Sequence, residues 1–347
     1  MQNTFAENSC QGFFEPPSPW TLFIRGRAGS WPGSRDRAGK KDQGEPDVGG
    51  RSPPPGDLSF DIRGAGFYTG EAAHRPRIEI GNPRLSFIFQ SLCSGSSGNC
   101  LLLKAGGTTL LIDAGFSSLK GCRKALGGVL PHLDGAVISH LHTDHIHYAS
   151  LRVLEENRIP LYVAEKDIPH LAAGQFRRSP FLELKLRPFL EQPFRVGNFS
   201  ILPFRVPHDG VRRTFGFEIT LGSDRKGKKA VVATDFWHWQ GVSPRFEDAD
   251  FIYVEANHDR GLLRANPNPR SRFHLSNEDC GRLLRRALGK SRKPPGAVML
   301  GLLSEIRNRP ALARDTVLEG LEGAPYRNIP LHIAPRHEPS PEIEVGR

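Results

Sequence analysis

Residues 136–145, which read Ala-Val-Ile-Ser-His-Leu-His-Thr-Asp-His, join an apolar run to four side chains that can bind a metal. The apolar run predicts a buried strand. Side chains on a strand repeat every two residues, so His140 and His142 project to the same side of its end. A turn after them can direct Asp144 and His145 toward a second point. Two imidazoles suit zinc, and a carboxylate with an imidazole suits a neighbouring ion. The alternative, an exposed His-rich turn, is disfavoured by the buried strand that precedes it.

The sequence around this stretch alternates between short apolar runs and amphipathic segments. Strands are expected at residues 85–90, 100–104, 109–112, 136–139, 161–164, 200–204, 215–220, 230–233 and 251–255. Helices are expected at residues 119–126, 148–157, 278–288 and 311–321. The early part is rich in strands, whereas the later strands alternate with helices. This order predicts a layered α/β protein rather than a barrel or a helical bundle.

Composition divides the chain at about residue 80. Residues 1–80 contain nine of the 29 Pro and twelve of the 37 Gly residues, a level typical of low-complexity sequence. Their Pro-rich runs at 15–19 and 52–56 favour polyproline II or turns over helices. We therefore expect an unfolded or extended tail at residues 1–80, one large domain at residues 85–335 and a short C-terminal tail at residues 336–347.

Charge divides the chain differently. The 347 residues include 47 Lys and Arg against 37 Asp and Glu, a net charge of +10. Residues 1–80 hold ten basic and ten acidic side chains, so the whole excess belongs to the rest of the chain. Residues 281–293 alone carry six basic side chains and no acidic one. Such a surface attracts a polyanion, although a solvated helix face is the common alternative.

Several classes of protein are excluded by what the sequence lacks. No apolar run approaches the ~20 residues of a membrane-spanning helix, and the first residues lack the basic and apolar regions of a signal peptide. The five Cys residues form no Cys-x-x-Cys pair, which argues against a zinc ribbon or a disulfide framework. Cys93, Cys100 and Cys122 are expected to be buried small apolar residues. We expect a cytoplasmic protein without a membrane partner; the oligomeric state is open.

The run His140-Leu-His142-Thr-Asp144-His145 resembles the HxHxDH signature of the metallo-β-lactamase superfamily. Segments similar to the YycJ/WalJ-type branch of these hydrolases are SLCSGSSGNC at 91–100, LIDAG at 111–115, VEANHD at 254–259 and HLSN at 274–277. The resemblance implies an α/β fold with a four-layered αββα metallo-β-lactamase-like sandwich. It also implies two divalent metal ions, Zn²⁺ or Mn²⁺, and phosphodiesterase activity on nucleic acid, with a DNA exonuclease as the leading assignment. Asp144 is then both a metal ligand and a catalytic residue.

Two further metal ligands follow from the same resemblance. Val-Pro-His208-Asp is similar to the third motif of the superfamily, which makes His208 the third imidazole on the first metal. Ala-Thr-Asp235 is similar to the fourth motif, which makes Asp235 the carboxylate that bridges both metals. For His208 alone, an ordinary loop histidine is the alternative.

One position departs from the pattern of the superfamily. Relatives usually have a strand that ends in His-Leu-Ser where this chain reads Leu302-Leu-Ser, and leucine cannot bind a metal. Three outcomes are open: a weakened second metal site, a replacement ligand such as His258 or His274, or a single metal. We favour the weakened but occupied site; loss of activity is the further alternative.

The remaining site residues come from the loops that follow strands. The Ser/Gly-rich loop can present Ser96 and Asn99 to phosphate oxygens, although a tight turn needs the same glycines. Asn257 is expected to contact substrate, and His258 and His274 are expected to act in catalysis as proton donors. A structural hydrogen-bonding role is the alternative for both imidazoles.

Together these features predict a phosphodiesterase of nucleic acid, with DNA favoured over RNA. Two divalent ions can lower the pKa of a shared water toward 7, and the expected nucleophile is the resulting metal-bound hydroxide. Two other functions are kept open. The first is hydrolysis of a small cyclic phosphodiester, a lactone or a thioester. The second, motivated by Leu302, is a catalytically impaired protein that binds metal and nucleic acid.

Overall fold

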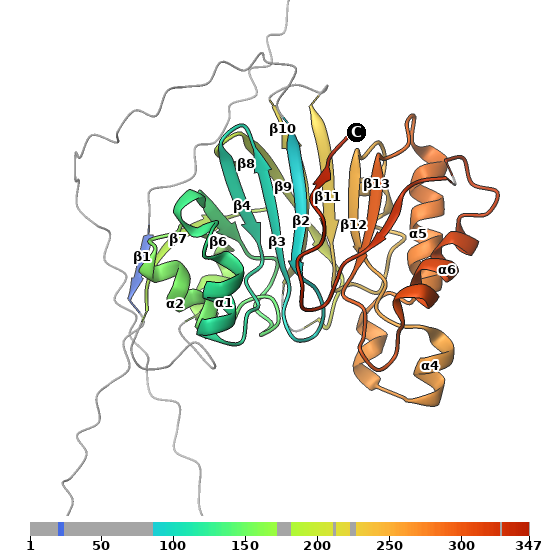
Figure 1. Cartoon of the computed structure of the whole chain (residues 1–347), viewed down its shortest axis with the longest axis horizontal. Helices are drawn as coiled ribbons and strands as arrows, with labels where there is room; N and C mark the ends of the chain where they lie inside the picture. The colour runs from blue at the N-terminus through green and yellow to red at the C-terminus, as the bar shows by residue number, and fades with distance from the viewer. Residues whose placement is uncertain are drawn as a thin grey trace, which may run out of the picture.

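Two β-sheets pack face to face and helices cover their outer faces, so that the chain forms four layers (Figure 1). This computed structural model describes residues 20–23, 86–171, 182–210, 213–222, 227–326 and 328–346. The predicted αββα sandwich is confirmed. None of the helices within the described ranges is both long and apolar enough to cross a membrane.

The first sheet has eight strands. In spatial order they are β1 (Trp20–Phe23), β7 (Glu183–Phe189), β6 (Leu161–Ala164), β5 (Gly135–Val137), β4 (Thr108–Ile112), β3 (Cys100–Ala105), β2 (Phe87–Cys93) and β15 (Ile343–Glu344). Strands β4, β5, β6 and β7 run parallel, so their carboxyl ends lie at one edge of the sheet.

The second sheet has seven strands. In spatial order they are β14 (Leu331–Ile333), β13 (Ala297–Gly301), β12 (Phe251–Glu255), β11 (Lys228–Ala233), β10 (Thr214–Leu221), β9 (Phe199–Val206) and β8 (Phe194–Val196). Strands β11 to β14 run parallel, while β8 to β10 form antiparallel hairpins.

Helices α1 and α2 lie outside the first sheet, and α5 and α6 lie outside the second (Figure 1). The α-helices are α1 (Leu119–Leu126), α2 (Tyr148–Glu156), α3 (Ile168–Leu171), α4 (Arg260–Ala265), α5 (Asn277–Lys290) and α6 (Pro310–Gly320). The 3₁₀ turns are η1 (Leu130–His132), η2 (Glu165–Asp167), η4 (Ser243–Phe246) and η5 (Pro269–Phe273).

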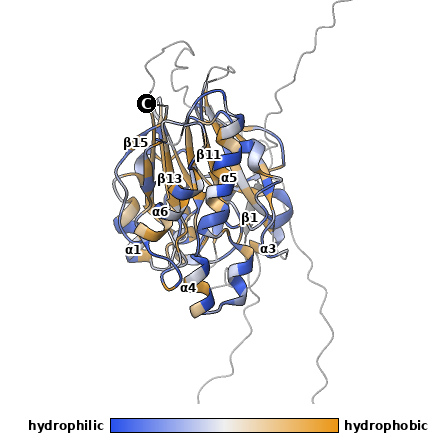
Figure 2. Ribbon diagram, turned by 90° about the vertical axis from the view of Figure 1, so that its right-hand side faces the viewer, coloured by the Kyte–Doolittle hydropathy of each residue, from blue (hydrophilic) through white to orange (hydrophobic). Residues whose placement is uncertain are grey.

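The longest helix, α5, follows directly from its sequence. Ser276 caps its first turn by accepting a hydrogen bond from the backbone N–H of Asp279, which satisfies a donor that the helix leaves free. Acidic side chains in the first turn complement the helix dipole. Leu283 and Leu284 are buried while Arg285 and Arg286 face solvent. Figure 2 shows this alternation of polar and apolar residues along α5.

Aromatic side chains fill the space between the two sheets. The Phe89 ring lies 4.4 Å from that of Phe251 and 5.5 Å from that of Tyr253, and Phe87 lies 5.1 Å from Phe199. Separate apolar clusters join the first sheet to α1 and α2, and the second sheet to α5 and α6. The central parallel strands are therefore buried on both faces, which is why β5, β6, β12 and β13 read as continuous apolar runs.

The strands and helices expected from periodicity are present with shifted ends. Strands β1, β7, β8, β13, β14 and β15 were not among those expected from periodicity, and β13 was implied only by the resemblance to relatives that have a strand before residue 302. Three of these have only two or three residues, too few for a period-two pattern, and β7 contains Pro188. Helices α3 and α4 were missed because four and six residues are too few to show the helical period of 3.6 residues.

Both ends of the chain differ from the tails that we expected. Trp20–Phe23 forms β1 beside β7, because the free edge of β7 offers unpaired backbone groups; the rest of residues 1–80 lies outside the described residues. Residues 336–346 are not a loose tail either. β15 pairs with β2, and the Ser340 hydroxyl accepts a hydrogen bond from the Ser91 N–H at 3.0 Å.

The four described cysteines are free and buried, as expected for small apolar residues. Burial raises the pKa of the Cys93 thiol to about 12 and that of Cys122 to about 11. These thiols therefore stay protonated at neutral pH and cannot serve as nucleophiles.

Candidate metal centre

The candidate metal centre lies where the carboxyl ends of parallel strands from both sheets meet. Asp113 follows β4, His140 follows β5 and Asp235 follows β11. Asp113 and Asp235 adopt φ angles of 63° and 60°, a left-handed conformation that non-glycine residues rarely take. Backbone strain of this kind gathers at functional sites, where the surrounding structure enforces it.

Three groups of potential ligands come together there. In each group, one ligand atom per residue lies within 4.8 Å of the others. The groups are His140, His142 and His208; His140, His145 and Asp235; and His208, Asp235 and His274. The structure thus gathers residues from well-separated parts of the chain around one point.

In the first group, one nitrogen of each ring lies close to the other rings, and its second nitrogen forms a hydrogen bond with a residue outside the group. Nδ1 of His142 lies 2.9 Å from Nε2 of His140 and 3.3 Å from Nε2 of His208. The other ring nitrogen of each imidazole has its own partner: the Ser139 hydroxyl for His140, the Asp209 carboxylate for His142, and the Phe273 carbonyl for His208. Metal-binding histidines usually have such a partner, which fixes the tautomer and the ring orientation.

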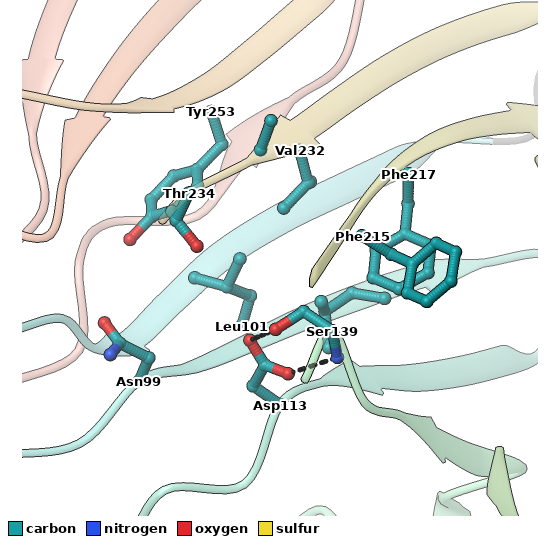
Figure 3. Close-up of a pocket in the computed structure, with 11 residues that line it drawn as sticks. Asn99, Leu101, Asp113, Ser139, Phe215, Phe217, Val232, Thr234 and Tyr253 are labelled. Atoms are coloured by element: carbon teal, nitrogen blue, oxygen red, sulfur yellow. Dashed lines mark hydrogen bonds between the residues drawn. The ribbon is translucent and has the colours of Figure 1, made fainter. Parts of the chain in front are cut away.

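A hydrogen bond also fixes the orientation of the His145 ring. Its Nδ1 donates to Oδ2 of Asp113 at 2.7 Å, so Nε2 faces Oδ2 of Asp235 at 3.0 Å. Asp113 also accepts hydrogen bonds from the Ser139 N–H and hydroxyl, each at 2.8 Å. Figure 3 shows Asp113 and Ser139 facing one another across these two bonds.

Electrostatics keep two of the imidazoles neutral. Burial lowers the pKa of His140 well below its usual value and that of His142 to about 4. A neutral imidazole offers its lone pair to a metal without first losing a proton. For His145, burial lowers the pKa, but the Asp235, Asp113 and Asp144 carboxylates outweigh it and raise the pKa well above the usual value.

The residues present fit a divalent cation. Oδ2 of Asp235 is buried and, apart from the ion-pair contact with Nε2 of His145 at 3.0 Å, has no hydrogen-bond partner among the described residues, although a buried carboxylate oxygen is costly to leave without one. A cation beside it, bound by the neutral imidazoles, would provide that partner. The donor set of imidazole nitrogens and one central carboxylate suits zinc and other first-row metals.

Asp144 stands at the margin of the centre. Its Oδ2 lies 3.7 Å from Nε2 of His145, and its side chain is 24% exposed. Among the described residues it belongs to none of the three ligand groups. Its roles as metal ligand and catalytic residue therefore stay predictions.

His274 lies at the centre, whereas His258 does not. Nδ1 of His274 lies 3.7 Å from Oδ1 of Asp235 and donates to Oε2 of Glu255 at 3.1 Å. Burial lowers the pKa of His274, but the Glu255 and Asp235 carboxylates outweigh it and raise the pKa to about 9. His258 is buried outside the three ligand groups of the described chain, and burial lowers its pKa to about 4. A proton donor at neutral pH is thus better supplied by His274.

Leu302 follows β13 with a φ of 54° and is buried. Its backbone is anchored: its N–H donates to the Ser94 hydroxyl at 2.8 Å, and its carbonyl accepts from Nδ2 of Asn257 at 2.9 Å. Of the two replacement ligands considered for this position, the structure brings His274 into a ligand group.

The three residues predicted to contact substrate differ in exposure to solvent. Ser96 is exposed at the tip of its loop. Asn99 is buried, its Oδ1 accepts from the Gly95 N–H, and its backbone N–H donates to the Asp144 carbonyl at 2.7 Å. These bonds favour a positioning role for Asn99 over contact with substrate. Asn257 is half-buried, and its bond to Leu302 likewise indicates a positioning role.

A small cavity lies between the sheets beside Asp113, Ser139, Thr234 and Tyr253 (Figure 3). Its volume of about 10 Å³ is at the lower limit for a single water molecule. This cavity is therefore too small to hold a substrate.

Sequence reasoning missed four residues of the site. Asp113, Ser139 and Asp209 orient imidazoles, and Glu255, which is fully buried, holds His274. Asp113 and Glu255 stand inside segments that resemble the hydrolase family, and both are acidic residues at the end of an apolar strand. That combination is the signal that could have identified them.

Comparisons with known proteins agree with this geometry. Residues 108–295 match the family model described as a beta-lactamase superfamily domain. The exodeoxyribonuclease WalJ of Streptococcus pneumoniae is 30% identical over 254 residues, 69% of this chain and 90% of that protein. The exodeoxyribonuclease YycJ of Bacillus anthracis is 27% identical over 253 residues, 67% of this chain and 89% of that protein. The crystal structure of the metallo-β-lactamase fold protein YhfI from Bacillus subtilis has a TM-score of 0.56 at 20% identity and covers 74% of this chain and 100% of that chain.

Proposed function

The chain belongs to the beta-lactamase superfamily as a metal-dependent hydrolase of the YycJ/WalJ type, and from this premise we propose that it is a DNA exonuclease. The observation that carries the proposal is the convergence of imidazoles and Asp235 on one point, with three of the imidazoles held from behind by hydrogen-bond partners. DNA is favoured over RNA because WalJ and YycJ are exodeoxyribonucleases. We place the protein in the cytoplasm.

In this proposal His140, His142, His145, His208 and Asp235 hold two divalent ions, Zn²⁺ or Mn²⁺, with Asp144 at the second site. Bound ions of this kind lower the pKa of water and polarise phosphoryl oxygens.

The protein's own residues supply the rest of the chemistry. Asp113 and Ser139 keep His145 oriented. His274 carries a proton at neutral pH, because its pKa is about 9, and it lies beside Asp235, where a leaving oxygen can take that proton. Glu255 accepts the hydrogen bond from Nδ1 of His274, so the proton that can be donated is the one on Nε2.

The basic surface near the site supports a polyanionic substrate. Part of the basic run at residues 281–293, on α5 and just after it, is neutralised locally, since Arg282 pairs with Asp279, Arg292 with Asp248, and Lys293 with Asp250. The side chains of Arg264, Arg270 and Arg272, on α4 and η5, offer further positive charge. In the described part of the chain no ion pair joins these three side chains to an acid. Because η5 leads directly into His274, Arg270 and Arg272 stand closer along the chain to this candidate ligand than the arginines of α5.

End-labelled single- and double-stranded oligonucleotides test the proposal, with metals added back one at a time after EDTA treatment. Cleavage should stop in EDTA and return with Zn²⁺ or Mn²⁺, and His208→Ala and Asp144→Ala should abolish it. The matched control is His132→Ala, an exposed histidine of η1. Undiminished cleavage by a folded Asp144→Ala protein would contradict the assigned role of Asp144. Turnover of a small ester while DNA is neither cut nor inhibitory would contradict the nuclease.

A further inference from the structure

A large aromatic side chain is exposed next to the candidate centre. Trp237 is 48% exposed, and it is the one aromatic residue among the exposed large apolar side chains of the described ranges. It stands two residues after Asp235 in the chain. Because burying an indole is strongly favourable, a half-exposed tryptophan at the edge of a site indicates a surface for a partner.

Hydrogen bonds fix the orientation of the Trp237 ring. Its Nε1 donates to the carbonyl of His208 at 3.1 Å, and its backbone N–H donates to the carbonyl of Pro207 at 3.2 Å. The ring is therefore tied to the backbone of a candidate metal ligand. A ring held in this way loses little conformational freedom when another ring stacks on it.

Phe273 and Arg272 approach His208 from a different segment. The Phe273 carbonyl accepts a hydrogen bond from Nδ1 of His208 at 3.1 Å, and the two rings lie 6.1 Å apart. The Arg272 guanidinium lies 4.6 Å above the Phe273 ring. His208 thus joins an exposed indole to an arginine-bearing turn, and Arg270 stands two residues before Arg272 on the same turn.

An exposed indole and an arginine-bearing turn, both in contact with His208, match the chemistry of a single-stranded nucleic acid. Bases stack on aromatic residues while the backbone phosphates bind to arginines. A base inside a duplex is already stacked and paired, so an unpaired terminal base is the natural occupant. A nuclease that acts from an end would present such a base beside its metal ligands.

We propose that Trp237 is a stacking platform for the terminal base of single-stranded DNA, with Arg270 and Arg272 binding the adjacent phosphates. The inference rests on the proposed nuclease function and adds the form of the substrate and the residue that recognises it. Stacking of one base accounts for a preference of about 5- to 150-fold over a strand end without a base.

Binding of an uncleavable DNA tests this platform separately from catalysis. The probe is a fluorescently labelled single-stranded phosphorothioate oligonucleotide, compared with the same strand carrying abasic residues at both ends. The full-length protein should bind the natural strand about 5- to 150-fold more tightly by fluorescence anisotropy. Trp237→Ala should remove that difference, and Trp237→Phe, which keeps a ring, should retain most of it. The control Leu190→Ala removes an exposed apolar side chain in the turn between β7 and β8 and should change nothing.

Three outcomes would overturn the platform: equal or undetectable binding of both strands by the unmodified protein, an unchanged preference in Trp237→Ala, or equal loss in Trp237→Phe and Trp237→Ala. The last result would assign the effect to the hydrogen bond on His208 instead of the ring. Base-dependent binding together with a lack of metal-dependent cleavage of any oligonucleotide would contradict the nuclease function and leave the platform standing.

Discussion

Nδ1 of His145 lies 2.7 Å from Oδ2 of Asp113, although the two residues are 32 positions apart in the chain. This contact crosses from the end of β4 to the loop after β5 and turns Nε2 of His145 toward Asp235. Both side chains are almost completely buried. The orientation of this imidazole is therefore set by a residue that cannot itself reach the substrate.

Asp113→Asn should weaken metal binding about 10- to 100-fold, because the amide no longer holds the proton on Nδ1 of His145. Competition with a chromophoric chelator measures the affinity. Asp134→Asn is the matched control, since Asp134 accepts a hydrogen bond from Thr109 near the start of β4, away from the site. Equal metal affinity in both variants would show that Asp113 does not act through His145.

Leu302→His should raise the amount of tightly held metal per chain. The backbone of residue 302 is anchored by two hydrogen bonds, so an imidazole there should occupy the position of the ligand that relatives have. Elemental analysis after dialysis measures it. Leu302→Asn is the control, because Asn also tolerates a φ of 54° but is a poorer ligand for zinc. An increase with His and none with Asn is expected. The same metal content in all three proteins would place residue 302 outside the metal centre.

Glu255→Gln should change how stability depends on pH in the metal-free protein. The pKa of His274 is raised from 6.5 to about 9, so the stabilisation is complete below about pH 6.5 and is lost as pH rises through about 9. The substituted amide keeps an oxygen for the Phe236 and Leu275 N–H groups but cannot hold the added proton on His274. The difference in unfolding free energy between the two proteins, from urea titrations, should shrink between pH 6.5 and pH 9. A difference that does not vary with pH would rule out this coupling.

Exchanging Arg270 and Arg272 together for Gln should lower the salt dependence of single-stranded DNA binding. Two lost phosphate contacts reduce the slope of log K against log salt by about 1.4. The control exchanges Arg285 and Arg286, which are exposed on α5. A larger change of slope in the α5 control would show that DNA binds along α5 and not along η5.

Gly115→Ala should destabilise the loop that carries the metal motif. A Cβ atom at this position would lie 1.9 Å from the Asp144 carbonyl oxygen and 2.8 Å from the Asn99 nitrogen, both of which are backbone atoms. We expect a loss of about 1–3 kcal/mol of unfolding free energy or more, measured by chemical denaturation. Gly128→Ala, where a Cβ meets nothing within 4 Å, should change stability by no more than about 0.5 kcal/mol. Similar stability of the two variants would contradict the close approach of these backbones.

The sequence predicted those features that depend on neighbours along the chain. The buried strand before His140, the amphipathic pattern of α5 and most strands of both sheets follow from periodicity within a few residues. The shortest elements were missed, because β8, β14 and β15 exist through pairing with partners that local sequence does not identify.

The sequence predicted the net charge of the domain but not which of its basic side chains are left unpaired on the surface. The sequence placed the whole excess of +10 after residue 80 and pointed to α5. In the structure Asp248 and Asp250, more than 40 positions away, neutralise Arg292 and Lys293. Arg270 and Arg272 of η5, four and two positions before His274, are closer along the chain to a candidate ligand than Arg282, the first arginine of α5.

By itself the sequence determined the class of fold and the identity of the candidate metal ligands around His140. Both depend on short segments, because the period of a strand and the types of ligand side chain involve only residues that are neighbours in the chain. Only the tertiary structure decided which distant groups meet them. Asp113, Glu255 and Trp237 act on His145, His274 and His208 through contacts across 32, 19 and 29 positions. Such contacts depend on the order of strands in two sheets, which brings the carboxyl ends of β4, β5, β11 and β12 together and which no local pattern encodes.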